Sequence, residues 1–447
     1  MPRRPTPSHG LLLAVTMACG SGNRGVVEDA PPPDAYQAAR QRLAALSPAA
    51  LPPPPPDPTN AYLADPRAAQ LGKKLFFDTR FSGPLLDEAN NGDPATLGLR
   101  GETGKVGCAS CHVPASGFSD TRSTRAQISL GSGWTHRRAK SLLDVAQSSL
   151  LNWDGRRDSA FSQPFTPLED PAELNSSRLF AAQQVAHLYR TEYEALFGPL
   201  PALDQYAPVA AADAGCTELP TDVIHGSCVK LGADDSDVTR VVVNLGKAIE
   251  AYTRQLACGP SRFDAWVAGD RGALSTDEQA GARLFVGKGA CDACHSGPYF
   301  SDRSYHNVGL HPDFRFFVAP IEDRGAESGL SAMLADPLNS LGPYSDGYDG
   351  RLDNLPSDPS SLAGAFSTPG LRCVAGRPSF MHTGQFRSLE DVVAFFDKGG
   401  DSDGYPGISE NFPRHLSAGE KAQLVSFLRA LDGAGPDAAL IEPPELP

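Results

Sequence analysis

The stretch Cys108-Ala109-Ser110-Cys111-His112 recurs later in the chain as Cys291-Asp292-Ala293-Cys294-His295. In such a segment the two thiols add across the vinyl groups of a haem, and the adjacent imidazole ligates its iron. The alternatives are a redox Cys-x-x-Cys or half of a zinc site, but neither copy has a second cysteine pair at zinc spacing. Two chance matches are negligible among nine cysteines and ten histidines in 447 residues. The sequence therefore predicts two covalently bound haem c groups, with His112 and His295 as iron ligands.

The surroundings of the two motifs indicate an internal duplication. Gly117-Phe118-Ser119-Asp120 follows the first motif, and Gly297-Pro298-Tyr299-Phe300-Ser301-Asp302 follows the second. Before the motifs, residues 68–76 correspond to residues 278–285, and both segments end in Leu-Phe. Ser275 with Glu278 forms a capping box, which marks the second segment as a helix. Each half therefore contains a helix that leads into a haem-binding loop.

The end of the chain completes this pattern. Residues 416–431 form an amphipathic segment that we expect to be the last helix of a cytochrome c fold. We therefore predict a mostly α fold with two cytochrome c-like haem domains in tandem and little sheet. Residues 205–232 and about 311–365 are polar or rich in Gly, Pro, Asp and Ser, and we expect both to be long loop insertions.

The predicted organisation has five parts, and two domains are expected at this length. The parts are a signal peptide with a lipobox at 1–19, a Pro-rich tether at 20–57, an N-terminal cytochrome c-like domain at 58–240, a C-terminal one at 241–435, and a tail at 436–447. The tether contains Pro31 to Pro33 and Pro52 to Pro56, and such runs are extended and form no core.

The amino terminus has the features of a bacterial export signal. Arg3 and Arg4 precede a short apolar run at 11–15, which is too short to span a bilayer. Ala18-Cys19-Gly20-Ser21 resembles a lipobox, in which the cysteine is lipidated and becomes the first mature residue. We expect an exported protein, periplasmic or held at the outer membrane, with the membrane contacted only through a lipid anchor at Cys19. Export agrees with covalent haem, which bacteria attach outside the cytoplasm.

The net charge excludes one class of partner. The chain carries a formal net charge of −14 at pH 7, so it would be repelled by the phosphates of a nucleic acid. A cationic protein partner is compatible with this charge.

A further set of motifs carries a family resemblance. They are Trp153-Asp154-Gly155-Arg156, Gln163, Pro167, Glu173, Leu371-Arg372, His382-x-Gly384, Leu389-Glu390-Asp391-Val392-Val393 and Gly399-Gly400. On these motifs the chain, from about Pro66 to Leu431, resembles the bacterial di-haem cytochrome c peroxidases, including the MauG branch that matures tryptophylquinone cofactors. The resemblance implies a peroxidatic haem in the N-terminal domain and an electron-transfer haem in the C-terminal domain.

The resemblance also implies roles for four residues. It places Trp153 between the two haems, where it relays electrons. It makes Glu173 the carboxylate of the distal pocket, where it moves a proton between the two peroxide oxygens and so helps to break the O–O bond. Gln163 and Pro167 line the same pocket in the family.

The first haem departs from the classical peroxidases. Their distal His ligand follows the first haem motif by about sixteen residues, but here that window reads Gln127-Ile128-Ser129-Leu130 and contains no ligand. The nearest histidine is His136, which we expect on an exposed loop. The first haem is therefore expected to be five-coordinate, held by His112, so that peroxide binds without reductive activation.

The second haem also departs from the family. The resemblance places its sixth ligand, Met or Tyr, at the position of Phe396, which has no donor atom. This haem is then either five-coordinate, which we favour, or ligated by another residue such as Met381.

Calcium is disfavoured by the same comparison. The Asn and Thr that accompany the calcium ion in the family correspond to Arg138 and Arg377. Two guanidinium groups would repel a nearby Ca²⁺ and would instead pair with carboxylates or haem propionates.

Four cysteines remain outside the haem motifs and the lipobox. We expect Cys216 and Cys228 to close the insertion that contains them. Cys373 stands where the family has Asn, and in an oxidising compartment we expect it to pair with Cys258. A thiolate haem ligand is the alternative.

The leading functional hypothesis is an exported peroxidase that reduces H₂O₂ with electrons from a small cytochrome c, a cupredoxin or a protein side chain. The second is MauG-like oxidation of a specific protein substrate. A third, of another class, is a non-catalytic di-haem electron-transfer cytochrome. The open first haem and the set Gln163, Pro167 and Glu173 argue against the third.

Overall fold

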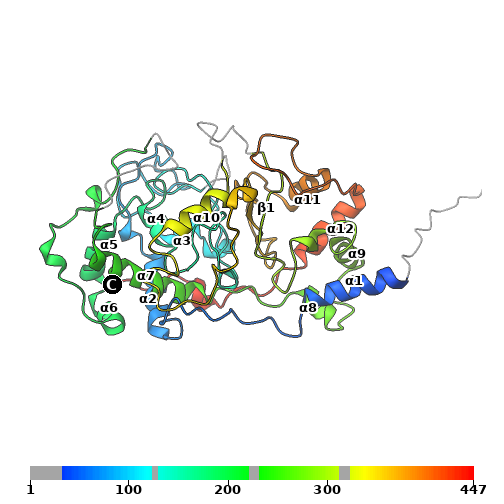
Figure 1. Cartoon of the computed structure of the whole chain (residues 1–447), viewed down its shortest axis with the longest axis horizontal. Helices are drawn as coiled ribbons and strands as arrows, with labels where there is room; N and C mark the ends of the chain where they lie inside the picture. The colour runs from blue at the N-terminus through cyan, green and yellow to red at the C-terminus, as the bar shows by residue number, and fades with distance from the viewer. Residues whose placement is uncertain (1–32, 123–128, 221–230, 312–322) are drawn as a thin grey trace, which may run out of the picture.

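Each haem motif lies in its own lobe of an elongated, mostly helical molecule (Figure 1). The computed structural model describes residues 33–122, 129–220, 231–311 and 323–447. The helices and strands are α1 (Pro33–Ala45), α2 (Pro66–Phe77), α3 (Cys108–Cys111), α4 (Phe165–Glu169), α5 (Arg178–Leu188), α6 (Arg190–Phe197), α7 (Ser236–Thr253), α8 (Arg262–Val267), α9 (Thr276–Phe285), β1 (Tyr305–His306), α10 (Ala326–Ala335), β2 (Phe366–Ser367), α11 (Leu389–Lys398), α12 (Ala418–Arg429) and α13 (Ala438–Ile441). In the described part, β1 and β2 form a small antiparallel sheet.

The first lobe is built on the packing of α2 against α7. Leu71 and Leu75 of α2 enter one apolar core with Val241 and Leu245 of α7. The two helices approach closely at Gly72, where an added Cβ would lie 1.8 Å from the carbonyl oxygen of Ala248. Glycine is therefore required at this crossing.

The second lobe repeats this arrangement with α9 and α12. A Cβ at Gly281 of α9 would lie 2.0 Å from the carbonyl oxygen of Gln423 in α12. Gly281 is the counterpart of Gly72 in the duplicated segments. The predicted capping box is present, because Ser275 Oγ accepts from the Glu278 N–H and Glu278 accepts from the Ser275 N–H. The mostly α fold with two similar haem domains is confirmed.

The predicted domain boundary at 240/241 is wrong. It falls inside α7, whose later residues, such as Leu245 and Ala248, belong to the first core. The first residue of the second core that follows α7 is Phe263 in α8. The boundary therefore lies between Thr253 and Arg262, because a continuous helix cannot be divided between two cores.

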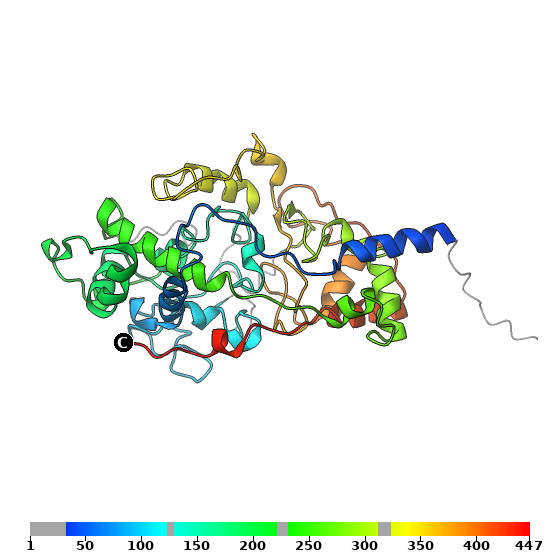
Figure 2. The ribbon, with the colours of Figure 1, turned by 90° about the horizontal axis from the view of Figure 1, so that it is seen from below.

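The Pro-rich tether predicted at 20–57 is also wrong for its described part, 33–57. Helix α1 packs on the second lobe, where Leu43 and Leu46 are buried in the core. The proline run then crosses toward the first lobe (Figure 2), and Tyr299 Oη donates to the carbonyl oxygen of Pro52 at 2.7 Å. Extended proline backbone has free carbonyl oxygens, and here other segments of the chain satisfy them.

The tail at 436–447 likewise joins the lobes. After α12 the chain returns along the molecule to the first lobe (Figure 2). Leu440 and Ile441 of α13 pack against a core that contains Phe76 and Tyr252, and Tyr252 Oη donates to the carbonyl oxygen of Leu440 at 2.6 Å. Both ends of the described chain therefore bridge the two lobes.

The insertion at 311–365 contains more structure than the predicted surface loop. Helix α10 buries Leu330 and Met333, and Leu338 enters the core of the first lobe. Lys247 pairs with Asp346 at 2.6 Å, and the Ser340 N–H donates to Asp158. A segment of the second half of the sequence thus covers the first lobe.

No helix in the described ranges is long and apolar enough to cross a membrane.

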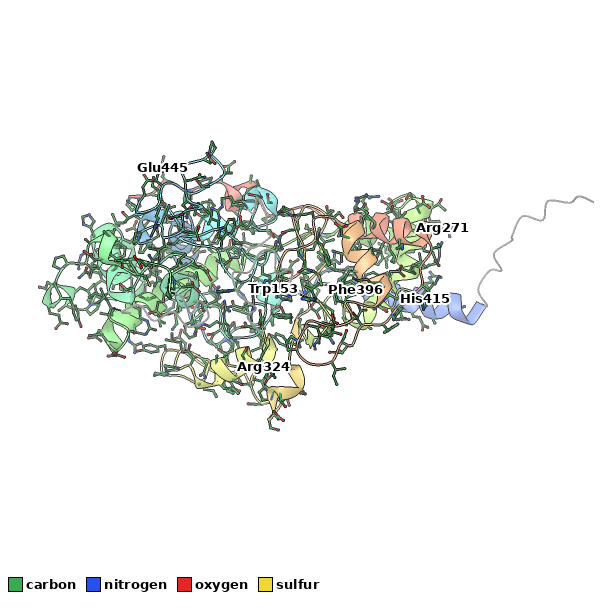
Figure 3. All side chains as sticks on the ribbon, turned by 90° about the horizontal axis from the view of Figure 1, so that it is seen from above. Trp153, Arg271, Arg324, Phe396, His415 and Glu445 are labelled. Carbon is green, nitrogen blue, oxygen red and sulfur yellow. A yellow bond between two sulfur atoms is a disulfide. The ribbon has the colours of Figure 1, made fainter. Side chains whose placement is uncertain are left out.

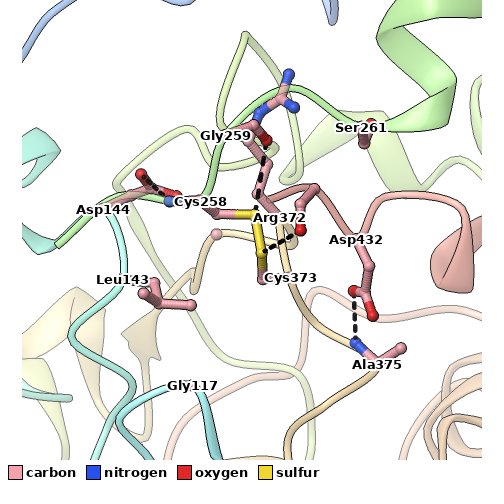
Figure 4. Close-up of a disulfide and its surroundings, with 12 residues drawn as sticks. Gly117, Leu143, Asp144, Cys258, Gly259, Ser261, Arg372, Cys373, Ala375 and Asp432 are labelled. Carbon is pink, nitrogen blue, oxygen red and sulfur yellow. Dashed lines mark hydrogen bonds between the residues drawn. A yellow bond between two sulfur atoms is a disulfide. The ribbon is translucent and has the colours of Figure 1, made fainter. Parts of the chain in front are cut away.

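The predicted Cys258–Cys373 disulfide is confirmed (Figure 4). It joins the segment between the two lobes to a loop of the second lobe. The Cys258 N–H donates to Asp144 Oδ1 at 3.1 Å, and the Cys373 N–H donates to the carbonyl oxygen of Leu431. Cys216 is also disulfide-bonded, whereas Cys228 lies outside the described residues.

Candidate haem-binding active site

The first motif forms the short helix α3, with His112 directly after it. Phe118 has a left-handed backbone, with φ of 55°, which turns its carbonyl oxygen toward the histidine. His112 Nδ1 lies 3.2 Å from this oxygen. Burial lowers the pKa of His112, so its imidazole is neutral, and with the proton on Nδ1 the lone pair on Nε2 can ligate a metal.

The second motif repeats the same geometry. Cys291–Ala293 forms a short 3₁₀ helix, and His295 Nδ1 lies 2.9 Å from the carbonyl oxygen of Phe300, whose φ is 53°. Burial again lowers the pKa of the histidine. Both histidines are therefore prepared in the same way to ligate iron through Nε2.

The first motif opens into a cavity of about 180 Å³ in the first lobe. The residues that line it include Cys108, Cys111, His112, Gln163, Pro167 and Glu173. The structure thus brings the predicted distal-pocket residues together with the first haem motif, although they are about fifty to sixty residues apart in the sequence. Their catalytic roles stay predictions.

Glu173 is a buried carboxyl group on the wall of this cavity. Its carbonyl oxygen accepts from the Ser132 N–H at 2.8 Å, which fixes the backbone at this point. Burial, with a smaller contribution from the nearby Asp170, raises the pKa of the Glu173 carboxyl to about 8, and Arg156 opposes this shift. The carboxyl group therefore exchanges a proton close to neutral pH.

A second cavity, of about 490 Å³, lies beside the second motif. Trp153 lines both cavities, and it lies near the middle of the long axis of the molecule (Figure 3). Its Nε1 donates to the carbonyl oxygen of Arg138 at 2.8 Å, and Lys140 Nζ lies 5.3 Å from the ring centroid. The structure thus places Trp153 between the two sites, which is the predicted position. Its role as an electron relay stays a prediction.

The comparisons with known proteins agree with this geometry. A family model described as di-haem cytochrome c peroxidase matches residues 66–272. The methylamine utilization protein MauG of Methylorubrum extorquens is 30% identical over 383 residues, which cover 86% of this chain and 82% of that protein. The chain belongs to the di-haem cytochrome c peroxidase/MauG family.

Two further relatives support this assignment. The cytochrome-c peroxidase IdrP2 of Denitromonas iodatirespirans is 29% identical over 373 residues, which cover 81% of each chain. The crystal structure of the diheme peroxidase BthA from Burkholderia thailandensis superposes with a TM-score of 0.60, at 24% identity over 88% of this chain and 93% of that one, which supports the fold. The chain is therefore an oxidoreductase of the cytochrome c peroxidase family.

The family implies two haem c groups, and the described residues fit them. Each cavity has a Cys-x-x-Cys-His motif on its wall and a neutral histidine with Nε2 available. Arg138, between the cavities, has buried Nε and Nη2 atoms without a hydrogen-bond partner among the described residues. Such orphaned donors fit the carboxylates that a haem brings.

The first haem was predicted to lack a distal protein ligand. Gln127 and Ile128 lie outside the described residues, and Ser129 is buried on the cavity wall. His136 was predicted on an exposed loop, and this prediction is wrong. The residue is partly buried, because the segment 129–139 folds back on itself. It lines neither cavity.

The second cavity contains Met381, which the sequence suggested as an alternative ligand, and a second donor, Tyr405, which it did not reveal. Phe396 lines it, as do Met381 and Tyr405. Tyr405 lies nine positions after Phe396 on a loop, so no helical spacing marks it. His306 also lines this cavity, but its ring nitrogens lie 2.7 Å from Asp302 and 2.7 Å from Glu410. Hydrogen bonds to Asp302 and Glu410 raise the pKa of His306 and engage both ring nitrogens, so neither nitrogen is free to bind iron.

Proposed function

We propose that this chain is an exported di-haem c-type peroxidase that reduces hydrogen peroxide at the N-terminal haem. The observation that supports it best is the wall of the first cavity, where Glu173, Gln163 and Pro167 lie with the haem ligand His112. A carboxyl group that exchanges protons near neutral pH provides the acid–base chemistry that O–O cleavage requires. An electron-transfer cytochrome needs no such group, which disfavours that alternative.

The reaction consumes two electrons and two protons for each H₂O₂ and releases two molecules of water. When bound, the first haem supplies the iron that receives peroxide and the two electrons that cleave the O–O bond. The Glu173 carboxylate takes a proton from one peroxide oxygen and returns it to the other, which leaves as water. The Gln163 amide hydrogen-bonds and orients the peroxide, and Pro167 supplies an apolar wall.

Electrons reach the first cavity one at a time through Trp153, which lines both cavities. Their source is a small cytochrome c, a cupredoxin or a protein side chain that docks near the C-terminal haem. Export to the periplasm or the outer membrane, with a lipid anchor at Cys19, is part of this proposal. The residues concerned lie outside the described part of the chain.

The second candidate function is MauG-like oxidation of a specific protein substrate. The 30% identity to the methylamine utilization protein MauG favours it, because the match covers most of both chains. The two functions share the peroxide step and differ in the electron donor. Peroxide turnover supported by small reduced cytochromes or cupredoxins would favour the peroxidase.

The experiment that tests the proposal separates the two haem sites. A pyridine haemochrome assay should give two haems per chain. Cys108→Ala combined with Cys111→Ala should leave one haem and remove all peroxide reactivity, because the first cavity then holds no haem. The matched control is Cys291→Ala with Cys294→Ala, which should also leave one haem but still react with peroxide in stopped-flow mixing. Peroxide reactivity that survives loss of the first haem would contradict the proposal.

A further inference from the structure

Arg138 is buried and Arg377 is partly buried beside the cavities, and both have side-chain donor atoms without a hydrogen-bond partner among the described residues. Arg138 lines both cavities, and Arg377 lines the second. The two arginines are close enough for the positive charge of Arg377 to lower the pKa of Arg138. Arg138 is 4% exposed, and the orphaned atoms are Arg138 Nε, Arg138 Nη2 and Arg377 Nε. Neither side chain forms an ion pair with a described residue.

The other buried arginines nearby are paired. Arg137 forms ion pairs with Asp154 and with Asp323, the latter at 2.6 Å. Arg372 is bidentate to Asp264, at 2.8 and 2.9 Å. The chain therefore supplies carboxylates to its buried guanidinium groups as a rule, and Arg138 and Arg377 are exceptions.

The backbone holds both exceptions in place. The Arg138 N–H donates to the carbonyl oxygen of His382 at 2.8 Å, and Trp153 donates to the Arg138 carbonyl oxygen. Arg377 Nη2 donates to the carbonyl oxygens of Gly370 and Arg372 at 2.9 and 3.1 Å. Burial lowers the pKa of Arg138 to about 9 and that of Arg377 to about 10, which reflects the cost of leaving these charges unpaired.

Each haem carries two propionate carboxylates, and Arg138 lines both cavities while Arg377 lines the second. We propose that Arg138 and Arg377 bind carboxylates of the two haems, as a cationic bridge between the sites, and that this bridge replaces a calcium ion. The inference rests on the proposed occupancy of both cavities by haem. It assigns to two residues of this chain a binding site that spans the interface between the lobes.

The side chains of Arg138 and Arg377 do not fit calcium. Among the described residues, the one group of three His, Cys, Asp or Glu ligand atoms within mutual reach is Cys294, Asp302 and His306. That group lies at the second haem loop, its thiol is used for haem attachment, and its histidine is held by two carboxylates. Arg138 and Arg377 offer hydrogen-bond donors only, whereas Ca²⁺ requires oxygen ligands.

The test measures the midpoint potentials of both haems by spectroelectrochemistry, together with haem content. A nearby positive charge favours the ferrous state, so Arg138→Gln should lower both potentials, and Arg377→Gln should lower that of the second haem. Arg377→Lys keeps the positive charge, so the potential of its second haem should stay close to the wild-type value. Arg178→Gln is the matched control, because Arg178 pairs with Glu169 and lines neither cavity, and it should leave both potentials unchanged.

A second measurement addresses calcium. The purified holoprotein should contain no stoichiometric calcium by elemental analysis, and a chelator should leave its potentials and electron paramagnetic resonance spectrum unchanged. One bound calcium per chain, or unchanged potentials in both glutamine variants at full haem content, would overturn the inference. These readouts need no peroxide, so failure of the peroxidase proposal would be seen separately.

Discussion

At the scale of single residues, the carboxyl group of Glu173 decides whether the first cavity is catalytic. Glu173→Gln removes the proton acceptor and keeps the shape, so formation of the oxidised enzyme should slow by about 10²–10⁴-fold while haem content is unchanged. Stopped-flow mixing with H₂O₂ measures this rate. Glu192→Gln is the control, since Glu192 lies on α6 and lines neither cavity. An unchanged rate in Glu173→Gln would refute the assigned role.

The pH dependence follows from the same group. Burial raises the pKa of Glu173 to about 8, so the carboxylate that accepts a proton from peroxide is the minor form at neutral pH. The rate should therefore rise from pH 6 and level off above about pH 8. In Glu173→Gln this rise should disappear, and a wild-type profile that is flat or falls over this range would contradict the assignment.

Iron coordination is a second property of single residues. Phe396 has no donor atom, and neither Ser129 nor Leu130 is a usual haem ligand, so the ferric protein should give a dominant high-spin signal in low-temperature electron paramagnetic resonance. Phe396→Met should convert one centre toward six-coordination and change its potential, because the axial ligand controls haem redox chemistry. A spectrum with two low-spin haems would contradict this prediction. Met381→Leu and Tyr405→Phe would then identify the ligand at the second centre.

At the scale of elements, the same close helix crossing occurs in both lobes. Gly72 and Gly281 are equivalent by sequence, and a Cβ at either would lie about 2 Å from a backbone oxygen of the partner helix. Gly281→Ala should therefore lower the free energy of unfolding by about 1–3 kcal/mol. Chemical denaturation measures this. Gly419→Ala in α12 is the control, because its Cβ would meet nothing closer than 4.0 Å, and it should be neutral or slightly stabilising.

At the scale of the whole molecule, the Cys258–Cys373 disulfide closes a loop of 115 residues that contains the second haem motif. Cys258→Ser with Cys373→Ser should lower the free energy of unfolding by about 2–4 kcal/mol, because the open chain gains conformational freedom when it unfolds. Denaturation of the oxidised protein measures the loss. Equal stability of the double variant and the wild type would contradict the prediction, and a thiol assay of the unfolded wild type should detect neither cysteine.

The sequence by itself determined the haem-attachment motifs, the duplication, the family and the helices at 276–285 and 418–429. These features could be predicted because covalent haem chemistry, capping boxes and helical spacing are local properties. The tertiary structure decided how distant segments cover one another. It assigned α7 to the first lobe, packed 33–57 and the tail across both lobes, and placed α10 over the first lobe, because burial depends on partners far away in the chain. It also showed Tyr405 in the second cavity and the unpaired donor atoms of Arg138 and Arg377 beside the cavities. No spacing rule predicts these positions, since they follow from the folding of loops onto helices.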